Sequence, residues 1–198
     1  MGPMQEIGTL IVQTLGSLYL LVVMLRFLLQ LARADFYNPI SQFIVKATNP
    51  LLIPIRRVVP GIMGIDLAGL LLALVVQFLI IEICALIIMG SLINPLYGLL
   101  WSAVGILGLA ANIFFWGLLI MVIASWIAPH SDNPALMLVR QLVEPVMAPF
   151  RKLLPDMGGI DISPIFAFLA LNVVQVLIKY LAAAAGMGGV ARQLVMGI

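Results

Sequence analysis

Residues 49–66, NPLLIPIRRVVPGIMGID, are repeated as residues 144–161, EPVMAPFRKLLPDMGGID, at a spacing of 95 positions without a gap. From residue 38 to residue 66, nine of 29 positions are identical at this spacing, most of them proline, glycine, arginine or aspartate. Chance similarity between apolar segments would instead align leucine with valine. The chain is therefore an internal duplication, with one repeat in residues 1–95 and the other in residues 96–198.

The composition is that of an integral membrane protein. Hydrophobic residues make up 64% of the chain and charged residues 9%, and the mean hydropathy is +1.21, whereas soluble domains are roughly half apolar and a quarter charged. The net charge of +2 is too small to indicate nucleic-acid binding. Cys84 is the only cysteine, so neither an internal disulfide nor a thiolate metal site is expected.

Four apolar segments are long enough to cross a bilayer, which takes about 20 helical residues. We expect spans at about residues 7–31, 67–89, 99–127 and 162–185. The first span could be a cleaved signal peptide, but it follows Glu6 rather than basic residues and is longer than a signal core, which favours a retained helix. The expected fold class is all-α, with each of two repeats built from a span, a long connection and a second span.

The two long connections carry most of the positive charge. Each has about 34 residues, and both lie on one side of the membrane because two crossings separate them. They hold seven of the ten Lys and Arg residues, so the positive-inside rule places both connections in the cytoplasm. We therefore expect a multi-pass protein of the bacterial inner membrane whose two repeats run in the same direction.

Each long connection is predicted to form an amphipathic elbow on the membrane surface. A first helix begins at an Asn-Pro pair, with Asn38 or Asn133 as its cap and the apolar side toward lipid. A second, short helix begins at Pro50 or Pro145, bends at an inner proline and is stopped by a third proline. A glycine then lets the chain reverse, and an aspartate caps the next span. The residues expected to build the elbows are Pro50, Pro54, Pro60, Gly64, Asp66, Pro145, Pro149, Pro155, Gly159 and Asp161.

Four cationic residues follow the bends of the two elbows: Arg56, Arg57, Arg151 and Lys152. The simpler interpretation is that they fix the topology and anchor the elbows in an anionic leaflet, at about 1 kcal/mol each. The sharper interpretation is specific recognition of a phospholipid headgroup or of a partner's acidic loop, to which the planar fork of arginine is suited. An ion pair of Arg56 with Asp66, or of Arg151 with Asp161, is compatible with either interpretation.

Four polar residues are expected inside the spans: Gln77, Glu82, Asn172 and Lys179. Gln77 and Asn172 are repeat mates near the midplane and are expected to join helices by hydrogen bonds worth about 1 kcal/mol or less. Glu82 and Lys179 lie at similar depth and are expected to neutralise each other, while Arg26 extends to the surface. The alternative is a row of polar groups that conducts an ion or small osmolyte. Four helices enclose a narrow lumen, so one chain alone would be a poor pore, whereas an oligomer could form one.

The doubled pattern P-x-x-x-P-x-R-[RK]-x-x-P-x-x-x-G-I-D, in a small chain with four spans, resembles the YggT family of bacteria. That family is related to the YlmG proteins of Gram-positive bacteria and plastids. The resemblance implies links to osmotic-stress tolerance and ion balance, to cell division and envelope organisation, and in plastids to haem attachment and nucleoid distribution. It implies no catalytic residues.

No catalytic site is predicted from the residues themselves. His130 is the only histidine, and its neighbours Ser131 and Asp132 cannot align with it as a triad. No phosphate-binding loop or zinc motif is present, and no cofactor is expected. We expect a non-catalytic protein that organises or stabilises envelope or membrane-protein assemblies, contacts membrane lipids including anionic headgroups, and binds a membrane-protein partner or itself. The conduit is the alternative.

Overall fold

The computed structural model describes residues 2–61, 64–129, 131–153 and 161–198. Within these ranges the helices are α1 Pro3–Leu31, α2 Pro39–Val58, α3 Leu67–Met89, α4 Pro95–Ile127, α5 Pro134–Leu153, α6 Ser163–Ala184 and α7 Val190–Leu194. Helices α1, α3, α4 and α6 are long and apolar enough to span a membrane. Their ends differ from the predicted spans by at most four residues, which confirms the all-helical membrane architecture.

The spans begin and end at residues that satisfy their free backbone groups. Asp66 accepts a hydrogen bond from the Gly69 N–H at the start of α3, as predicted for an acidic cap. Gly90 ends this helix with φ of +69°, a conformation that glycine adopts without strain. Asn94 then caps α4 through the Leu96 N–H. The short connection makes α3 and α4 neighbours.

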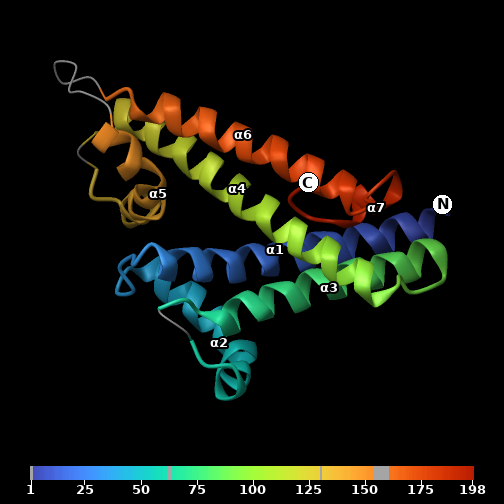
Figure 1. Ribbon diagram of the computed structural model, residues 1–198. Helices are drawn as coiled ribbons and strands as arrows, with labels where there is room; N and C mark the ends of the chain where they lie inside the picture. The colour runs from blue at the N-terminus through green and yellow to red at the C-terminus, as the bar shows by residue number, and fades with distance from the viewer. Residues whose placement is uncertain (1, 62–63, 130, 154–160) are drawn as a thin grey trace.

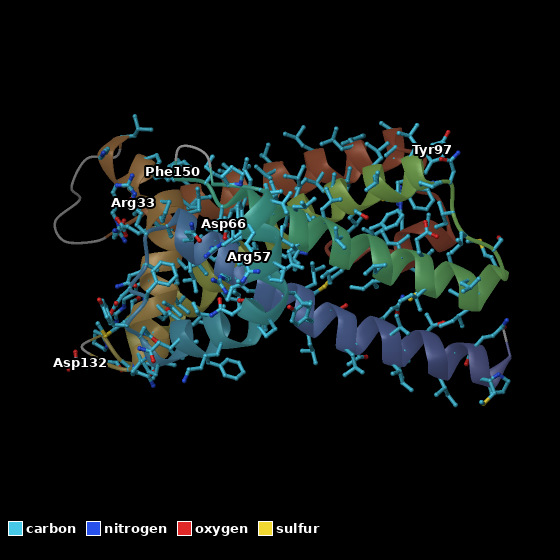
Figure 2. The ribbon with its side chains drawn as sticks, turned by 90° about the horizontal axis from the view of Figure 1, so that it is seen from below. Arg33, Arg57, Asp66, Tyr97, Asp132 and Phe150 are labelled. Atoms are coloured by element: carbon cyan, nitrogen blue, oxygen red, sulfur yellow. The ribbon has the colours of Figure 1, made fainter. Side chains whose placement is uncertain are left out.

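The four spans run side by side, and both elbow helices lie at the same end of them (Figure 1). Helix α1 packs on α3, α3 on α4, and α4 on α6, so the spans are ordered mainly as a row rather than as a closed ring. Figure 2 shows Arg57, Asp66 and Asp132 at the elbow end, whereas Tyr97 lies at the opposite end. The charge of the chain is therefore concentrated where α2 and α5 cross the spans.

Each elbow helix is packed onto its own repeat. Ile44 and Leu52 of α2 are buried in a cluster with Met24 of α1 and Leu72 of α3. The corresponding cluster of the second repeat holds four buried residues of α4, α5 and α6 beside Ala167: Leu118, Val143, Met147 and Leu171. The elbows are thus part of the folded structure, and Phe43 on the other side of α2 is exposed.

The prediction of two short helices in each elbow is wrong. Helices α2 and α5 are each continuous, with Pro50 and Pro54, or Pro145 and Pro149, inside them. All four prolines are exposed, so their rings and the helical hydrogen bonds that they remove lie on the outside of the fold rather than in its core. Helix α2 ends at Val58, before the predicted stop.

The reversal after the first elbow uses Gly64, whose φ of +84° lies in the region that favours glycine. Its counterpart Gly159 lies outside the described residues, as do Pro155 and His130.

The carboxyl-terminal segment folds back against α4. The Trp101 Nε1–H donates to the Ala185 carbonyl over 2.8 Å, and the Asn112 amide donates to the Gly197 carbonyl over 3.3 Å. A Cβ placed at Gly108 would collide with the Gly197 backbone. The carboxyl-terminal segment is therefore packed closely on α4, and the small size of Gly108 makes this approach possible.

Candidate functional site

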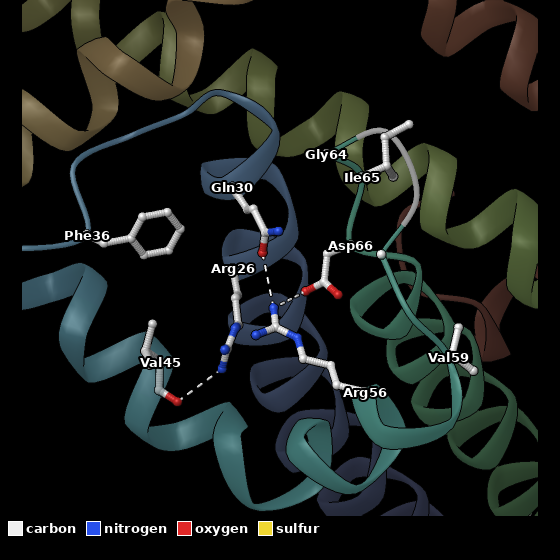
Figure 3. Close-up of a pocket in the computed structure, with 10 residues that line it drawn as sticks. Arg26, Gln30, Phe36, Val45, Arg56, Val59, Gly64, Ile65 and Asp66 are labelled. Atoms are coloured by element: carbon white, nitrogen blue, oxygen red, sulfur yellow. Dashed lines mark hydrogen bonds and ion pairs between the residues drawn. The ribbon is translucent and has the colours of Figure 1, made fainter.

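The first elbow is closed by an ion pair between Arg56 and Asp66. The Arg56 Nη2 contacts Asp66 Oδ2 and also donates to Gln30 Oε1 over 3.2 Å, as Figure 3 shows. The Asp66 side chain is 4% exposed and still caps α3 through the Gly69 N–H. Arg56 therefore connects α2 to α1 and to the start of α3.

The second elbow repeats this ion pair in a more open form. The Arg151 Nε lies 3.2 Å from Asp161 Oδ2, and the Asp161 side chain is 48% exposed. The Arg151 Nη1 also contacts Glu144 Oε2 over 2.8 Å. Contrary to prediction, Ile162 rather than Asp161 is the N-cap of α6. Asp161 nevertheless accepts a hydrogen bond from the Ser163 N–H over 2.9 Å.

These contacts set the acidity of Asp161. Partial burial alone would raise the pKa of this carboxyl group. Hydrogen bonds from Ser163 and Arg151 favour the charged carboxylate and outweigh burial, so the pKa of Asp161 lies below its usual value. The Arg151–Asp161 pair is therefore ionised at neutral pH.

A pocket lies beside each ion pair, of about 550 Å³ in the first repeat and about 610 Å³ in the second. Both volumes fall within the range typical of small-molecule sites. Five lining positions of one pocket match five of the other at the repeat spacing: Arg26 and Met121, Gln30 and Ser125, Val45 and Arg140, Arg56 and Arg151, and Asp66 and Asp161. The duplication has therefore produced two pockets from equivalent positions and lined them differently.

Arg26 lines the first pocket, contrary to its predicted role. It does not extend to the surface: it is 6% exposed, and its Nη1 donates to the Val45 carbonyl, Thr48 Oγ1 and Asn49 Oδ1. Helix α2 crosses α1 at the depth of this guanidinium and supplies these acceptors. The signal that could have identified it is an arginine within a span together with polar Thr48 and Asn49 on the elbow.

The other predicted elbow cations differ in their surroundings. Arg57 and Lys152 are exposed, and neither takes part in an ion pair with a described residue. They lie next to exposed apolar residues, Val58 and Leu153. Arg56 and Arg151 are bound to aspartate, so the four cations do not form one uniform group.

The predicted hydrogen-bonding role of Gln77 and Asn172 between helices is wrong. Gln77 is fully buried, and neither its Oε1 nor its Nε2 has a partner among the described residues. Asn172 is exposed and donates to the Phe168 carbonyl of its own helix. The pair that joins α4 to α6 is Gln175 Nε2 to Asn112 Oδ1, at 3.0 Å. Gln175 was missed because its repeat mate is apolar.

The predicted pair of Glu82 with Lys179 is also wrong. Glu82 is buried, and its Oε2 accepts a hydrogen bond from the Ile93 N–H over 3.0 Å. Lys179 is exposed on α6. The two helices do not bring these side chains together because α3 packs on α4, and α4 in turn on α6.

Among the described residues, no group of three or more His, Cys, Asp or Glu side chains is placed so that it could hold a metal ion. The first elbow pocket is suited to fixing helices and to binding an anion, because the charged groups of its described lining are two guanidinium donors and one carboxylate.

Comparison with known proteins identifies the architecture. The CCB3/YggT family model matches twice, at residues 5–87 and 100–182, and the starts of the two matches differ by the same 95 positions. The uncharacterised protein PA0392 of Pseudomonas aeruginosa is 56% identical over 181 residues, covering 89% of this chain and 91% of that protein.

More distant relatives match over a similar length. An uncharacterised protein of Vibrio alginolyticus is 41% identical over 165 residues, covering 82% of this chain and 88% of the relative. The uncharacterised protein YggT of Escherichia coli K12 is 40% identical over 170 residues, covering 84% and 86% of the two chains. No solved structure matches. This chain therefore belongs to the CCB3/YggT family and is a multi-pass membrane protein built from two copies of the family's unit.

Proposed function

We propose that this protein is a non-catalytic organiser of the bacterial inner membrane, which holds envelope or membrane-protein assemblies together and supports tolerance of osmotic stress. The observation that carries this proposal is the coupling of the two elbows into one platform. The Asn38 amide donates to the Pro134 carbonyl over 2.7 Å, and the Asp35 N–H donates to Gln141 Oε1 over 2.9 Å. A platform of this kind suits a docking function better than a reaction.

The outward face of the platform supports the same role. Phe43 and Val58 on the first elbow are exposed, as are Trp126 and Leu153 in the second repeat. Such side chains, next to the exposed cations Arg57 and Lys152, suit the interface between lipid tails and headgroups. Seven of ten Lys and Arg residues fall in the two connections, which supports a cytoplasmic location for this face.

Site-specific photo-crosslinking in intact cells tests the organising role. A photo-reactive amino acid at Phe43 is expected to capture the same identified membrane protein in repeated experiments. The matched control is Ile7, which is also exposed but lies near the amino terminus of α1, away from the elbows. Captures that are equal at both positions, or absent at the elbow, would contradict the proposal.

The conduit for ions or small osmolytes is the second candidate. Asn112 and Gln175 form a polar, hydrogen-bonded pair between α4 and α6. Gln77, however, is fully buried and Asn172 is exposed on the outside of the helices, so these residues do not line a common path with that pair. A conduit would therefore have to be formed by several copies. Ion flux in proteoliposomes that contain only this protein tests it, and flux no greater than in empty vesicles would exclude it.

A further inference from the structure

Arg26 is a buried cation whose hydrogen-bonding capacity is only partly used. Its Nη1 is held by α2, but its Nε has no partner among the described residues and is inaccessible to water. A buried guanidinium with an unused donor is costly unless another group compensates it. Because Arg26 lines the first pocket, an anion bound there can compensate the charge of its guanidinium group, although the Nε itself has no surface through which it could be reached.

The charge of the first pocket points to the kind of occupant. Arg26, Arg56 and Asp66 line it together, so the two cations exceed the single anion by one unit. Arg26 enters from α1 and Arg56 from α2 (Figure 3). Two guanidinium groups therefore face one cavity, and the only carboxylate among the described residues of its lining is that of Asp66 at the start of α3. One further negative charge would balance the charge of the pocket.

The remaining lining favours an amphiphile over a free ion. Phe36, Val45, Val59 and Ile65 supply apolar wall to the same pocket. The pocket lies at the elbow end of the spans, where α2 leaves α1 and where the charged residues gather. A lipid that enters sideways can place its phosphate against the arginines and the start of its acyl chains against these apolar residues.

We propose that the first elbow pocket binds the phosphate group of one anionic phospholipid, with Arg26 and Arg56 as its donors. The phosphodiester carries one negative charge and accepts the planar, forked hydrogen bonds that guanidinium groups offer. A zwitterionic lipid brings its own cation into the pocket and restores the surplus charge. The inference goes beyond the organising role and does not depend on it.

The second pocket has no surplus of positive charge among its described lining residues. Met121 replaces Arg26, and Glu144 stands where the first repeat has Asn49. The cations Arg140 and Arg151 are matched by Glu144 and Asp161 in the lining, so the surplus charge is absent. The site is therefore expected in one repeat only, with one lipid for each chain.

Native mass spectrometry of the full chain in neutral detergent can count the bound lipids. With phosphatidylglycerol as the probe we expect one tightly bound lipid, and with phosphatidylcholine none at the same concentration. Arg26→Met, which installs the residue of the second repeat, is expected to weaken phosphatidylglycerol binding about ten-fold, the effect of losing a charge-assisted hydrogen bond. The control Arg57→Gln removes an exposed cation from α2 and should change the affinity less than about two-fold.

Asp66→Asn keeps the inference testable if Arg26→Met fails to fold. Asparagine still caps a helix, and the substitution removes the negative charge that competes for the arginines, so binding should tighten. Weaker binding in Asp66→Asn, equal binding of the two lipids, or an equal loss in Arg57→Gln and Arg26→Met would overturn the inference. Displacement of the lipid by an equal concentration of inorganic phosphate would show a free-anion site and would overturn the lipid assignment. None of these results bears on crosslinking at Phe43.

Discussion

The two ion pairs that close the elbows are chemically alike, but their different burial predicts different contributions to stability. Asp66→Ala removes the contact with Arg56 and the cap on Gly69 of α3. The Asp66 carboxylate is almost completely buried, so the charge-assisted hydrogen bond is worth about 1.5–3 kcal/mol. The cap adds about 1 kcal/mol. We expect Asp66→Ala to lower the free energy of unfolding by about 2.5–4 kcal/mol.

Asp161→Ala is the matched substitution in the second repeat. Both members of that pair are roughly half exposed, so the pair is worth about 0.2–1 kcal/mol. The hydrogen bond from the Ser163 N–H adds about 1 kcal/mol. The expected loss is therefore about 1–2 kcal/mol, roughly half the loss in Asp66→Ala.

Reversible unfolding in mixed micelles with increasing denaturing detergent measures both losses. Asp66→Asn, which keeps a cap and removes the charge, separates the two contributions in the first elbow. Equal destabilisation by Asp66→Ala and Asp161→Ala would refute the reasoning from burial. So would an Asp66→Asn variant as stable as the unchanged protein, because the ion pair would then contribute nothing.

Three further predictions follow from the same contacts. The pKa of Asp161 is lowered from its ordinary value of 3.8. The Asp161 carboxylate therefore stabilises the fold at a pH above 3.8, and this stabilisation is lost as the pH falls through the lower pKa of the folded state. Unfolding curves for Asp161→Asn should lack this acid-dependent loss. Gly108→Val should release the carboxyl-terminal segment to added protease, whereas Gly8→Val, where a Cβ meets only ordinary contacts, should not. Gln175→Leu should destabilise the chain by about 0.5–1 kcal/mol and Lys179→Met by less; the reverse order in unfolding measurements would contradict the assignment of Gln175 as the link to α4.

The sequence predicts most of the fold because the deciding signals are local or duplicated. Span lengths follow from apolar runs, and the Arg56–Asp66 pair could be anticipated because both residues recur in the second elbow. The continuity of α2 through Pro50 and Pro54 could not be anticipated, since it depends on which side of the helix packs on the core and which side is exposed.

The sequence does not predict which helices are lateral neighbours. Glu82 and Lys179 are predicted to meet because they lie at similar depth along the membrane normal. Depth does not say which helices are neighbours, and α4 packs between α3, which carries Glu82, and α6, which carries Lys179. Arg26 was misassigned for the same reason, because its acceptors Thr48 and Asn49 lie on a helix whose path across α1 is a tertiary feature.

The spans within each repeat differ in length, and bilayer thickness therefore acts on them unequally. Helices α1 and α4 have 29 and 33 residues, whereas α3 and α6 have 23 and 22. At about 1.5 Å per residue the longer helices exceed a hydrocarbon layer of about 30 Å by roughly 14–20 Å, and the shorter ones nearly match it. Hydrophobic mismatch consequently falls on the first span of each pair, at a fraction of a kcal/mol for each ångström. A thinner bilayer therefore adds to a large existing mismatch in the first span of each pair and to a small one in the second.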